Sequence, residues 1–191
     1  MTAGGSATSG VRISAVIPTY NRAGLVVRAI RSALESSRPP DEIIVVGDGD
    51  TDGSSQAARD AGVQVVRLPV CSGPARARNE GAQIARGDIL FFVDADVAVH
   101  PDAIDQVVGA FQRESDLAAV FGSYDDAPSE INFLSQYKNL MHHYVHQTAR
   151  EEAFTFWAGC GAVRRDVFFA VDGFDERYRR PCIEDIELGY R

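Results

Sequence analysis

The chain has 191 residues, 45% of them hydrophobic, and a formal net charge of −8. This length and composition suit one globular domain with its own core, and the acidic balance, without a Lys/Arg-rich run, argues against a nucleic-acid-binding surface. The three cysteines lie far apart in the sequence. We therefore expect free thiols in a reducing cytoplasm, and neither disulfides nor a zinc site.

Strand and helix patterns alternate along much of the chain. After a Gly/Ser/Thr-rich leader at residues 1–10, strands are predicted at 11–17, 42–46, 63–68, 89–93 and 117–121, and helices at 25–34, 54–61, 75–85 and 102–111. Pro18 is expected to stop the first strand, and Asn21 to be the N-cap of the helix that follows. The alternation predicts one α/β domain over residues 11–191, with a single doubly wound, mostly parallel sheet flanked by helices.

Two of the predicted strands end in acidic residues. The strand at 89–93 runs into Asp94-Ala95-Asp96, where the small Ala95 lets both carboxylates converge on one cation. Hard oxygen ligands of this kind suit Mg²⁺ or Mn²⁺ bound to a pyrophosphate. Taken alone, an Asp-x-Asp pattern is more often a helix cap, here for the helix expected near Pro101.

The other acidic strand end is Asp48, which follows the strand at 42–46. Parallel strands place their carboxyl ends side by side, so Asp48 and the Asp94/Asp96 pair can face one pocket. A nucleotide diphosphate fits such a pocket. Asp48 would bind the base or ribose, the metal would hold the diphosphate, and Arg76 or Arg78 would meet its charge.

The pattern changes after residue 130. A helix is predicted at 131–145, and its apolar stripe leaves two interpretations: a helix packed on the sheet, which we favour, or contact with a membrane surface or lipid. The stripe consists of Phe133, Leu134, Tyr137, Leu140, Met141, Tyr144 and Val145. Further on, the glycines of Gly159-Cys160-Gly161 allow close approach of a ligand or another strand. The last segment, 184–191, carries no helix stop, so we expect the natural protein to continue.

Taken together, these segments resemble the family 2 glycosyltransferases of the GT-A fold. The matching pieces occur in the family's order and cover nearly the whole chain. They are Val16-Ile17-Pro18-Thr19-Tyr20-Asn21, Ile44-Val45-Val46 with Asp48-Gly49 and Thr51-Asp52, Ala77-Arg78-Asn79 with Gly81, Phe92-Val93-Asp94-Ala95-Asp96, Gly173-Phe174-Asp175 and Glu184-Asp185.

The resemblance implies metal-assisted, inverting transfer of a sugar from a nucleotide-diphosphate sugar, by family habit a UDP-sugar, to a saccharide or lipid-linked acceptor hydroxyl. It implies Asp185 as general base, with Glu184 as the competing candidate or else a surface acid at a helix start. The donor residues implied are Pro18, Thr19, Tyr20, Asn21, Asp48, Arg78, Asp94, Ala95 and Asp96, with Asp94 and Asp96 on the metal. The acceptor side implied is Trp157, Gly159, Cys160, Gly161 and Glu184, where Trp157 either stacks on a sugar or packs in the core. A lipid-linked acceptor would place the protein at the inner face of the membrane.

Two departures from the family pattern bear on function. The family commonly has two adjacent acids where this chain has Gly47-Asp48, and the chain stops before a later segment that often closes over the donor. The alternative functions are a non-catalytic nucleotide-sugar-binding module and a nucleotidyltransferase. A nucleotidyltransferase would need a Gly-rich basic loop after the first strand, in the place that Pro18 to Asn21 occupy.

Overall fold

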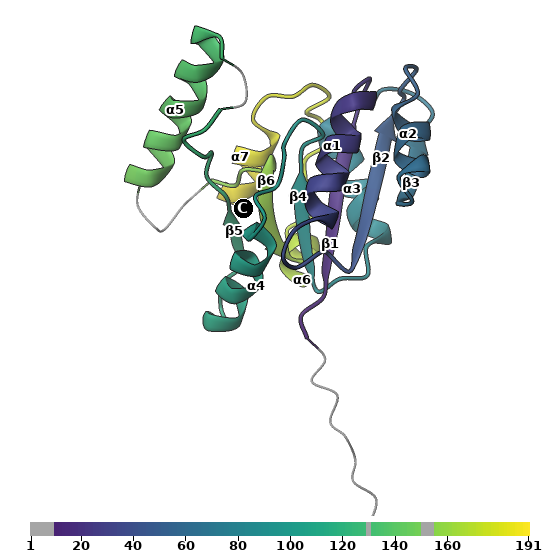
Figure 1. Cartoon of the computed structure of the whole chain (residues 1–191). Coiled ribbons are helices and arrows are strands. Elements are labelled where there is room, and N and C mark those ends of the chain that lie inside the picture. The colour runs from purple at the N-terminus through teal and green to yellow at the C-terminus, as the bar shows by residue number, and fades with distance from the viewer. Residues whose placement is uncertain (1–9, 129–130, 150–154) are drawn as a thin grey trace, which may run out of the picture.

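A computed structural model describes residues 10–128, 131–149 and 155–191. Its centre is a six-stranded sheet in the order β3-β2-β1-β4-β6-β5 (Figure 1). The strands are β1 (Ile13–Thr19), β2 (Glu42–Asp48), β3 (Gln64–Leu68), β4 (Ile89–Val93), β5 (Ala119–Phe121) and β6 (Cys160–Arg164). The pairs β3–β2, β2–β1 and β1–β4 are parallel, whereas β6 runs antiparallel to both β4 and β5. The predicted mostly parallel α/β sheet is confirmed, and the predicted leader, apart from Gly10, lies outside the described residues.

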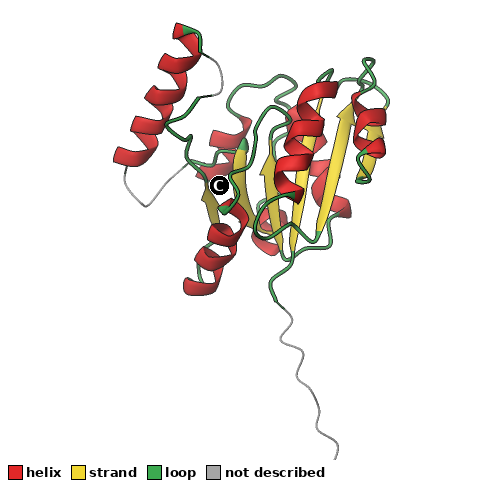
Figure 2. Cartoon of the chain, in the orientation of Figure 1, coloured by secondary structure: helices red, strands yellow, loops and turns green. Residues whose placement is uncertain are grey.

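Helices cover both faces of this sheet (Figure 2). They are α1 (Ala23–Leu34), α2 (Ser54–Asp60), α3 (Pro74–Ile84), α4 (Ala103–Arg113), α5 (Phe133–Thr148), α6 (Arg165–Ala170) and α7 (Glu184–Tyr190). Side chains of α1, α2 and α4 share one core with Ile13, Ala15 and Ile17 of β1, and those of α3, α6 and α7 share the other core with Val16. This division follows from the alternation of side chains along a strand.

The β1–α1 connection differs from its prediction in two ways. β1 continues through Pro18 to Thr19, because its pairing with β4 ends at Val16 and leaves no ladder partner there for the missing N–H. Asn21 does not cap α1; its backbone φ is +51°, and its side-chain oxygen accepts the Thr51 amide hydrogen at 2.8 Å. Residues from the β2–α2 turn satisfy the start of α1 instead. Ser54 Oγ accepts from Arg22 N at 2.8 Å, and Asp52 Oδ2 accepts from Ala23 N at 3.1 Å.

The prediction that the 131–145 helix packs on the sheet is wrong. No residue of α5 is buried, and Figure 1 shows the helix standing away from the sheet beyond β5. Its apolar stripe faces outward, with Phe133 79% and Tyr144 67% exposed. The helix contacts the rest of the chain through polar and aromatic side chains instead. The His146 ring centroid is 4.7 Å from that of Trp157, edge-on, and Asn139 Nδ2 donates to the Asp125 carbonyl at 2.7 Å. Within the described ranges, no helix combines the length and the apolar character needed to cross a bilayer.

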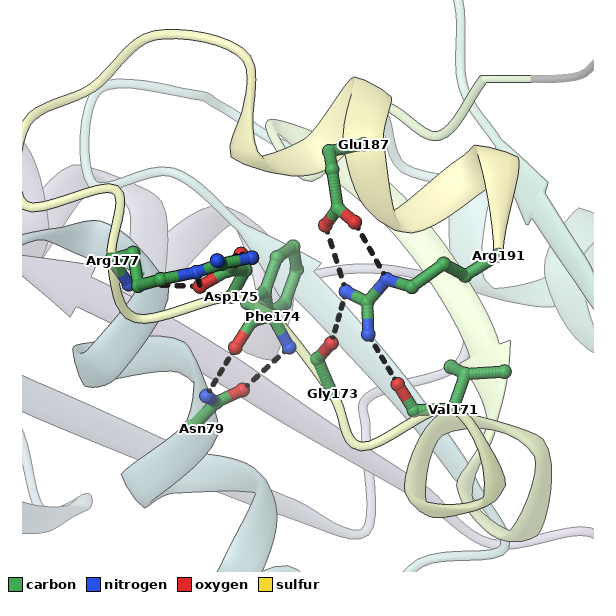
Figure 3. Close-up of polar contacts among 8 residues, drawn as sticks. All are labelled: Asn79, Val171, Gly173, Phe174, Asp175, Arg177, Glu187 and Arg191. Atoms are coloured by element: carbon green, nitrogen blue, oxygen red, sulfur yellow. Dashed lines mark hydrogen bonds and ion pairs between the residues drawn. The ribbon is translucent and has the colours of Figure 1, made fainter.

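The turn after α6 is fixed from two sides (Figure 3). Asn79 on α3 pairs with both backbone groups of Phe174: its Oδ1 accepts the amide hydrogen at 2.9 Å and its Nδ2 donates to the carbonyl at 2.8 Å. Arg191, after α7, donates to the carbonyls of Val171 and Gly173. These contacts hold the turn at 171–174 between α3 and the C-terminal end of α7.

Candidate active site

The carboxyl ends of β1, β2 and β4 open into one cleft of about 620 Å³. This is the edge at which open α/β sheets bind their ligands. The starts of α3 and α7 and the loop 179–182 complete the wall. The sequence-predicted residues that line the cleft are Pro18, Thr19, Tyr20, Asp48, Arg78, Asp94, Ala95, Asp96, Glu184 and Asp185.

Asp48 already accepts hydrogen bonds from two main-chain amides with its carboxylate. It is 4% exposed; its Oδ1 accepts the Ser72 amide hydrogen at 2.6 Å and its Oδ2 accepts that of Gly73 at 2.8 Å. The Cys71 thiol also lies 3.4 Å from Oδ2. The carboxylate therefore fixes the loop before α3 at the cleft. Its predicted contact with a base or ribose would have to use the lone pairs that these amides leave over.

The surroundings of Gly47 explain why this chain has glycine where the family commonly has the first of two adjacent acids. A Cβ at this position would overlap the Oγ of Ser55 and the carboxylate of Asp50. Both groups are buried, and Asp50 Oδ2 accepts the Ser55 amide hydrogen at 3.1 Å. A second acid at position 47 would therefore not fit in this chain.

Arg78 does not reach for a ligand, because its guanidinium joins two carboxylates. Nη2 donates to Asp94 Oδ1 at 2.8 Å and Nη1 donates to Glu184 Oε1 at 2.9 Å. Burial lowers the pKa of Arg78, but the charges and hydrogen bonds of Asp94 and Glu184 outweigh burial and raise it. Glu184 is thus neither a surface acid nor a free base: its side chain is 5% exposed, and its Oε2 accepts the Cys182 amide hydrogen at 2.9 Å.

Asp94 and Asp96 fit a cation site. Asp94 Oδ1 accepts a hydrogen bond from Arg78. Among the described residues, no hydrogen bond reaches Asp94 Oδ2 or the exposed carboxylate of Asp96. Burial raises the pKa of Asp94, Arg78 lowers it, and the nearby charges of Asp96 and Asp185 raise it further. Across the described ranges, no group of three or more His, Cys, Asp or Glu side chains is placed to hold a metal. A cation here would depend on two carboxylates with phosphate or water, which is the usual arrangement for Mg²⁺.

Asp185 lies in the first turn of α7 and lines the cleft. Its Oδ1 accepts the Ile186 amide hydrogen at 2.8 Å, and its Oδ2 accepts that of Ala158 at 3.4 Å. The Asp185 charge also raises the pKa of Asp94. Asp185 therefore lines the same cleft as the metal-binding candidates, and no cationic side chain among the described residues pairs with it.

Thr19 carries an unsatisfied polar atom. It is 3% exposed at the end of β1, and its Oγ1 is buried with no hydrogen-bond partner among the described residues. Thr19 lines the cleft. A buried hydroxyl without a partner costs free energy, so this atom is suited to a ligand that supplies one.

The remaining predicted residues lie away from the cleft lining. Asn21 binds the β2–α2 turn, and Gly159 accepts the Asp94 amide hydrogen at 3.0 Å. Cys160 is in β6, where burial raises the pKa of its thiol to about 11. A Cβ at Gly161 would overlap the carbonyl of Trp157, so this glycine permits an approach within its own segment. The acceptor role of residues 157–161 stays a prediction.

Sequence reasoning missed several residues that line the cleft. They are Arg22, Cys71, Gly73, Pro74, Ala77, Arg179, Arg180, Pro181 and Cys182. Pro74 is the first residue of α3, a position that proline favours, and this signal was available in the sequence. Arg179 and Arg180 had no such signal. Their segment lies against Gly73: a Cβ at Gly73 would be 2.5 Å from the carbonyl oxygen of Arg179.

Comparison with known proteins agrees with this geometry. The sequence profile described as Glycosyl transferase family 2 matches residues 14–170, a range that includes Asp48, Asp94 and Asp96. The chain belongs to glycosyl transferase family 2. Among curated proteins, it is 32% identical over 117 residues to an uncharacterized glycosyltransferase of Haemophilus influenzae, covering 59% of this chain and 46% of that one. It is 29% identical to the validoxylamine A glucosyltransferase of Streptomyces hygroscopicus subsp. limoneus, covering 94% of this chain and 47% of that one. The chain thus spans about half the length of these relatives.

Solved structures give the fold of this family 2 chain. The mannosyltransferase PcManGT of Pyrobaculum calidifontis, in complex with GDP-Man and Mn²⁺, matches with a TM-score of 0.72 and 24% identity, over 95% of this chain and 51% of that one. Staphylococcus aureus TarS 1–349, in complex with UDP-GlcNAc, matches with a TM-score of 0.72 and 19% identity, over 93% and 52%. The predicted GT-A fold is confirmed.

Proposed function

We propose that the protein transfers a sugar from a nucleotide-diphosphate sugar to an acceptor hydroxyl. The observation that carries this proposal is the convergence of Asp94, Asp96 and Asp185 with the unsatisfied hydroxyl of Thr19 on one cleft. Family membership supports it, and so do the complexes of PcManGT with GDP-Man and of TarS with UDP-GlcNAc. We propose a UDP-sugar as donor, and GDP is the comparison ligand.

The donor would lie along the ends of β1, β2 and β4. Pro18, Thr19 and Tyr20 would contact the nucleoside, with Thr19 Oγ1 gaining its missing hydrogen bond. Asp48 would act chiefly by holding the loop at 71–73 against the nucleoside. Arg78 would act by orienting Asp94, since both of its terminal nitrogens are engaged.

The diphosphate would lie between the acidic pair and two arginines. Asp94 and Asp96 would hold Mg²⁺ or Mn²⁺, which when bound stabilises the negative charge of the departing diphosphate. Arg179 and Arg180 line the same cleft, and no ion pair to either is found among the described residues. Guanidinium groups bind phosphate oxygens through paired hydrogen bonds. These two arginines are therefore suited to bind the diphosphate.

The acceptor would be activated by Asp185. Its carboxylate would take the proton of the acceptor hydroxyl as that oxygen attacks the anomeric carbon and the bond to the diphosphate oxygen breaks. A single displacement of this kind inverts the anomeric centre. Trp157, Gly159, Cys160 and Gly161 stay our proposal for the acceptor side, with a saccharide or a lipid-linked saccharide as acceptor.

We also propose that the apolar stripe of α5 rests on a membrane surface at its cytoplasmic face. The support is the outward exposure of Phe133, Leu134 and Tyr144. Because the chain carries a net charge of −8, zwitterionic vesicles are the appropriate test surface. Flotation with such vesicles, lost in a Phe133→Ser/Tyr144→Ser variant, is the expected result. Equal flotation of both proteins would refute the contact.

The donor site is tested by calorimetric titration of the chain with UDP, with Mn²⁺ and with a chelator. Metal-dependent binding is expected, and Asp96→Ala should abolish it. Asp116→Ala, which removes an exposed carboxylate outside the cleft lining, should bind as the wild type does. Binding of GDP in place of UDP would correct the nucleotide, and binding of neither would refute the proposal.

The base is tested with Asp185→Asn. This variant should bind UDP with unchanged affinity and lose transfer, because the amide cannot accept the proton. Retained transfer would refute the role of Asp185. Tight donor binding by the wild type, with no transfer to any acceptor and no donor hydrolysis, would instead identify a nucleotide-sugar-binding module.

A further inference from the structure

A bridge of three charged side chains, two of them buried, links the end of β4 to the start of α7 at the cleft. Arg78 on α3 lies between Asp94, at the end of β4, and Glu184, at the start of α7. Arg78 and Glu184 are each 5% exposed and Asp94 is 39% exposed. The guanidinium is a planar fork with fixed donor directions, so one carboxylate at each terminal nitrogen sets the orientation of both acids.

Within the described part of the chain, the bridge determines which carboxylate oxygens of Glu184 and Asp94 are hydrogen-bonded and which are free. Glu184 has both oxygens engaged, one on Arg78 and one on the Cys182 amide. Asp94 has one oxygen on Arg78, and its Oδ2 faces Gly159, where a Cβ would lie 3.5 Å from that oxygen. The bridge therefore takes one Asp94 oxygen and leaves the other available to a cation.

We propose that Glu184 is a positioning residue: by holding one end of Arg78, it keeps that guanidinium from covering both oxygens of Asp94. It also couples α7, which carries Asp185, to the β4 end, which carries Asp94. The coupling itself follows from the bridge, and its effect on a bound cation rests on the proposed donor site. Without the Glu184 charge, Arg78 would turn toward Asp94 and form the paired contact that arginine prefers with a carboxylate.

The first test is independent of any ligand. Thermal unfolding midpoints are measured for the wild type, Asp94→Asn, Glu184→Gln and the double variant. Each single variant leaves Arg78 one carboxylate, whereas the double variant leaves a buried cation with none. The unfolding midpoint of the double variant should therefore fall by more than the sum of the two decreases seen in the single variants. The control cycle combines Asp94→Asn with Glu187→Gln, which removes an α7 carboxylate paired with Arg191. In this cycle the two decreases in midpoint should be additive. Additivity in the Glu184 cycle would overturn the coupling.

The second test uses Mn²⁺ in the presence of UDP. Glu184→Gln should raise the Mn²⁺ concentration for half-saturation by about tenfold, within the range seen when groups that orient metal ligands are removed. Arg78→Lys provides a second variant, because an ammonium group cannot span both carboxylates, and it should shift the same way. Glu187→Gln should leave half-saturation unchanged. An unchanged value in folded Glu184→Gln would overturn the positioning role, as would loss of transfer with unaltered Mn²⁺ binding. A wild type that binds neither Mn²⁺ nor UDP, yet shows coupled midpoints, would refute the proposed function and support the coupling.

Discussion

Gly73 approaches Arg179 so closely that a Cβ on the glycine would lie 2.5 Å from the arginine's carbonyl oxygen. The backbone φ of Gly73 is +98°, which L side chains rarely adopt. This contact joins the loop held by Asp48 to the loop that brings Arg179 and Arg180 to the cleft.

The contact predicts that Gly73→Ala destabilises the fold and weakens UDP binding. Backbone strain accounts for about 1–3 kcal/mol, because a φ of 98° with a ψ of 161° suits glycine alone, and the overlap with Arg179 adds about 1–3 kcal/mol more. Gly62→Ala is the matched control, because Gly62 has a φ of +82° and nothing within 4 Å of an added Cβ. It should show the strain alone and bind UDP normally. Equal unfolding free energies of the two variants in urea would contradict the prediction.

Arg179→Ala/Arg180→Ala should lower UDP affinity at least about tenfold, since hydrogen bonds to charged groups contribute about 1.5–3 kcal/mol each. Uridine, which lacks phosphate, should bind this variant as it binds the wild type. Arg177→Ala serves as control, because Arg177 lies in the same loop but pairs with Asp175 outside the cleft lining. Calorimetry with both ligands measures the difference. A parallel loss of uridine binding would mean that the arginines shape the loop and do not contact phosphate.

Asn79→Asp should destabilise the protein by about 2–3 kcal/mol. The carboxylate could still accept from the Phe174 amide, but it would lose the donor that now contacts the Phe174 carbonyl at 2.8 Å (Figure 3). It would also face Glu176, whose Oε1 now accepts from Asn79 Nδ2 at 3.1 Å. Gln83→Glu makes the same chemical change on the exposed side of α3, one turn later. Urea unfolding followed by circular dichroism should show a large shift for the first variant and almost none for the second. Similar shifts would contradict the role of the Asn79 side chain.

Docking of α5 should weaken in acid. Burial, and then His142 and His143, lower the pKa of His146 below its ordinary 6.5. The undocked state therefore binds the proton more strongly, so the contribution of His146 is present above about pH 6.5 and is lost as the pH falls toward the lower folded value. Trp157 is the sole tryptophan, so its fluorescence reports the contact directly.

The expected result is a change in Trp157 emission between about pH 7 and pH 5, in step with His titration. His146→Phe keeps an aromatic ring against Trp157 and should remove most of that change. His100→Gln, at a histidine that pairs with Asp102 away from Trp157, should leave it intact. An unaltered pH profile in His146→Phe would assign the titration to another group.

Much of the fold followed from local patterns. The bounds of β4 are those predicted, because a short apolar run ended by acids can only be a buried strand end in this context. The gathering of Asp48, Asp94 and Asp96 on one cleft also followed, since parallel strands end at one edge, whereas Thr19 was named only through the family resemblance. These signals lie within single elements or within one strand–helix unit.

What could not be predicted depends on partners far away in the sequence. The sequence left Glu184 open between a second base candidate and a surface acid, because Arg78, its ion-pair partner, lies 106 residues earlier. The N-cap assignment of Asn21 failed because Ser54 and Asp52 satisfy the start of α1 from another turn. For α5, periodicity identified the apolar face correctly but carried no information on whether that face is covered.

The way Asp48 holds its loop has a practical consequence for protein engineering. The carboxylate binds the main-chain amides of residues 72 and 73, so it anchors the loop through backbone groups that every residue type at position 71 leaves in place. Cys71, whose thiol makes one long contact to Asp48, lines the cleft from the same loop. Position 71 is therefore suitable for a saturation library aimed at altered donor preference, because new side chains there change the cleft wall while the backbone of the loop stays anchored.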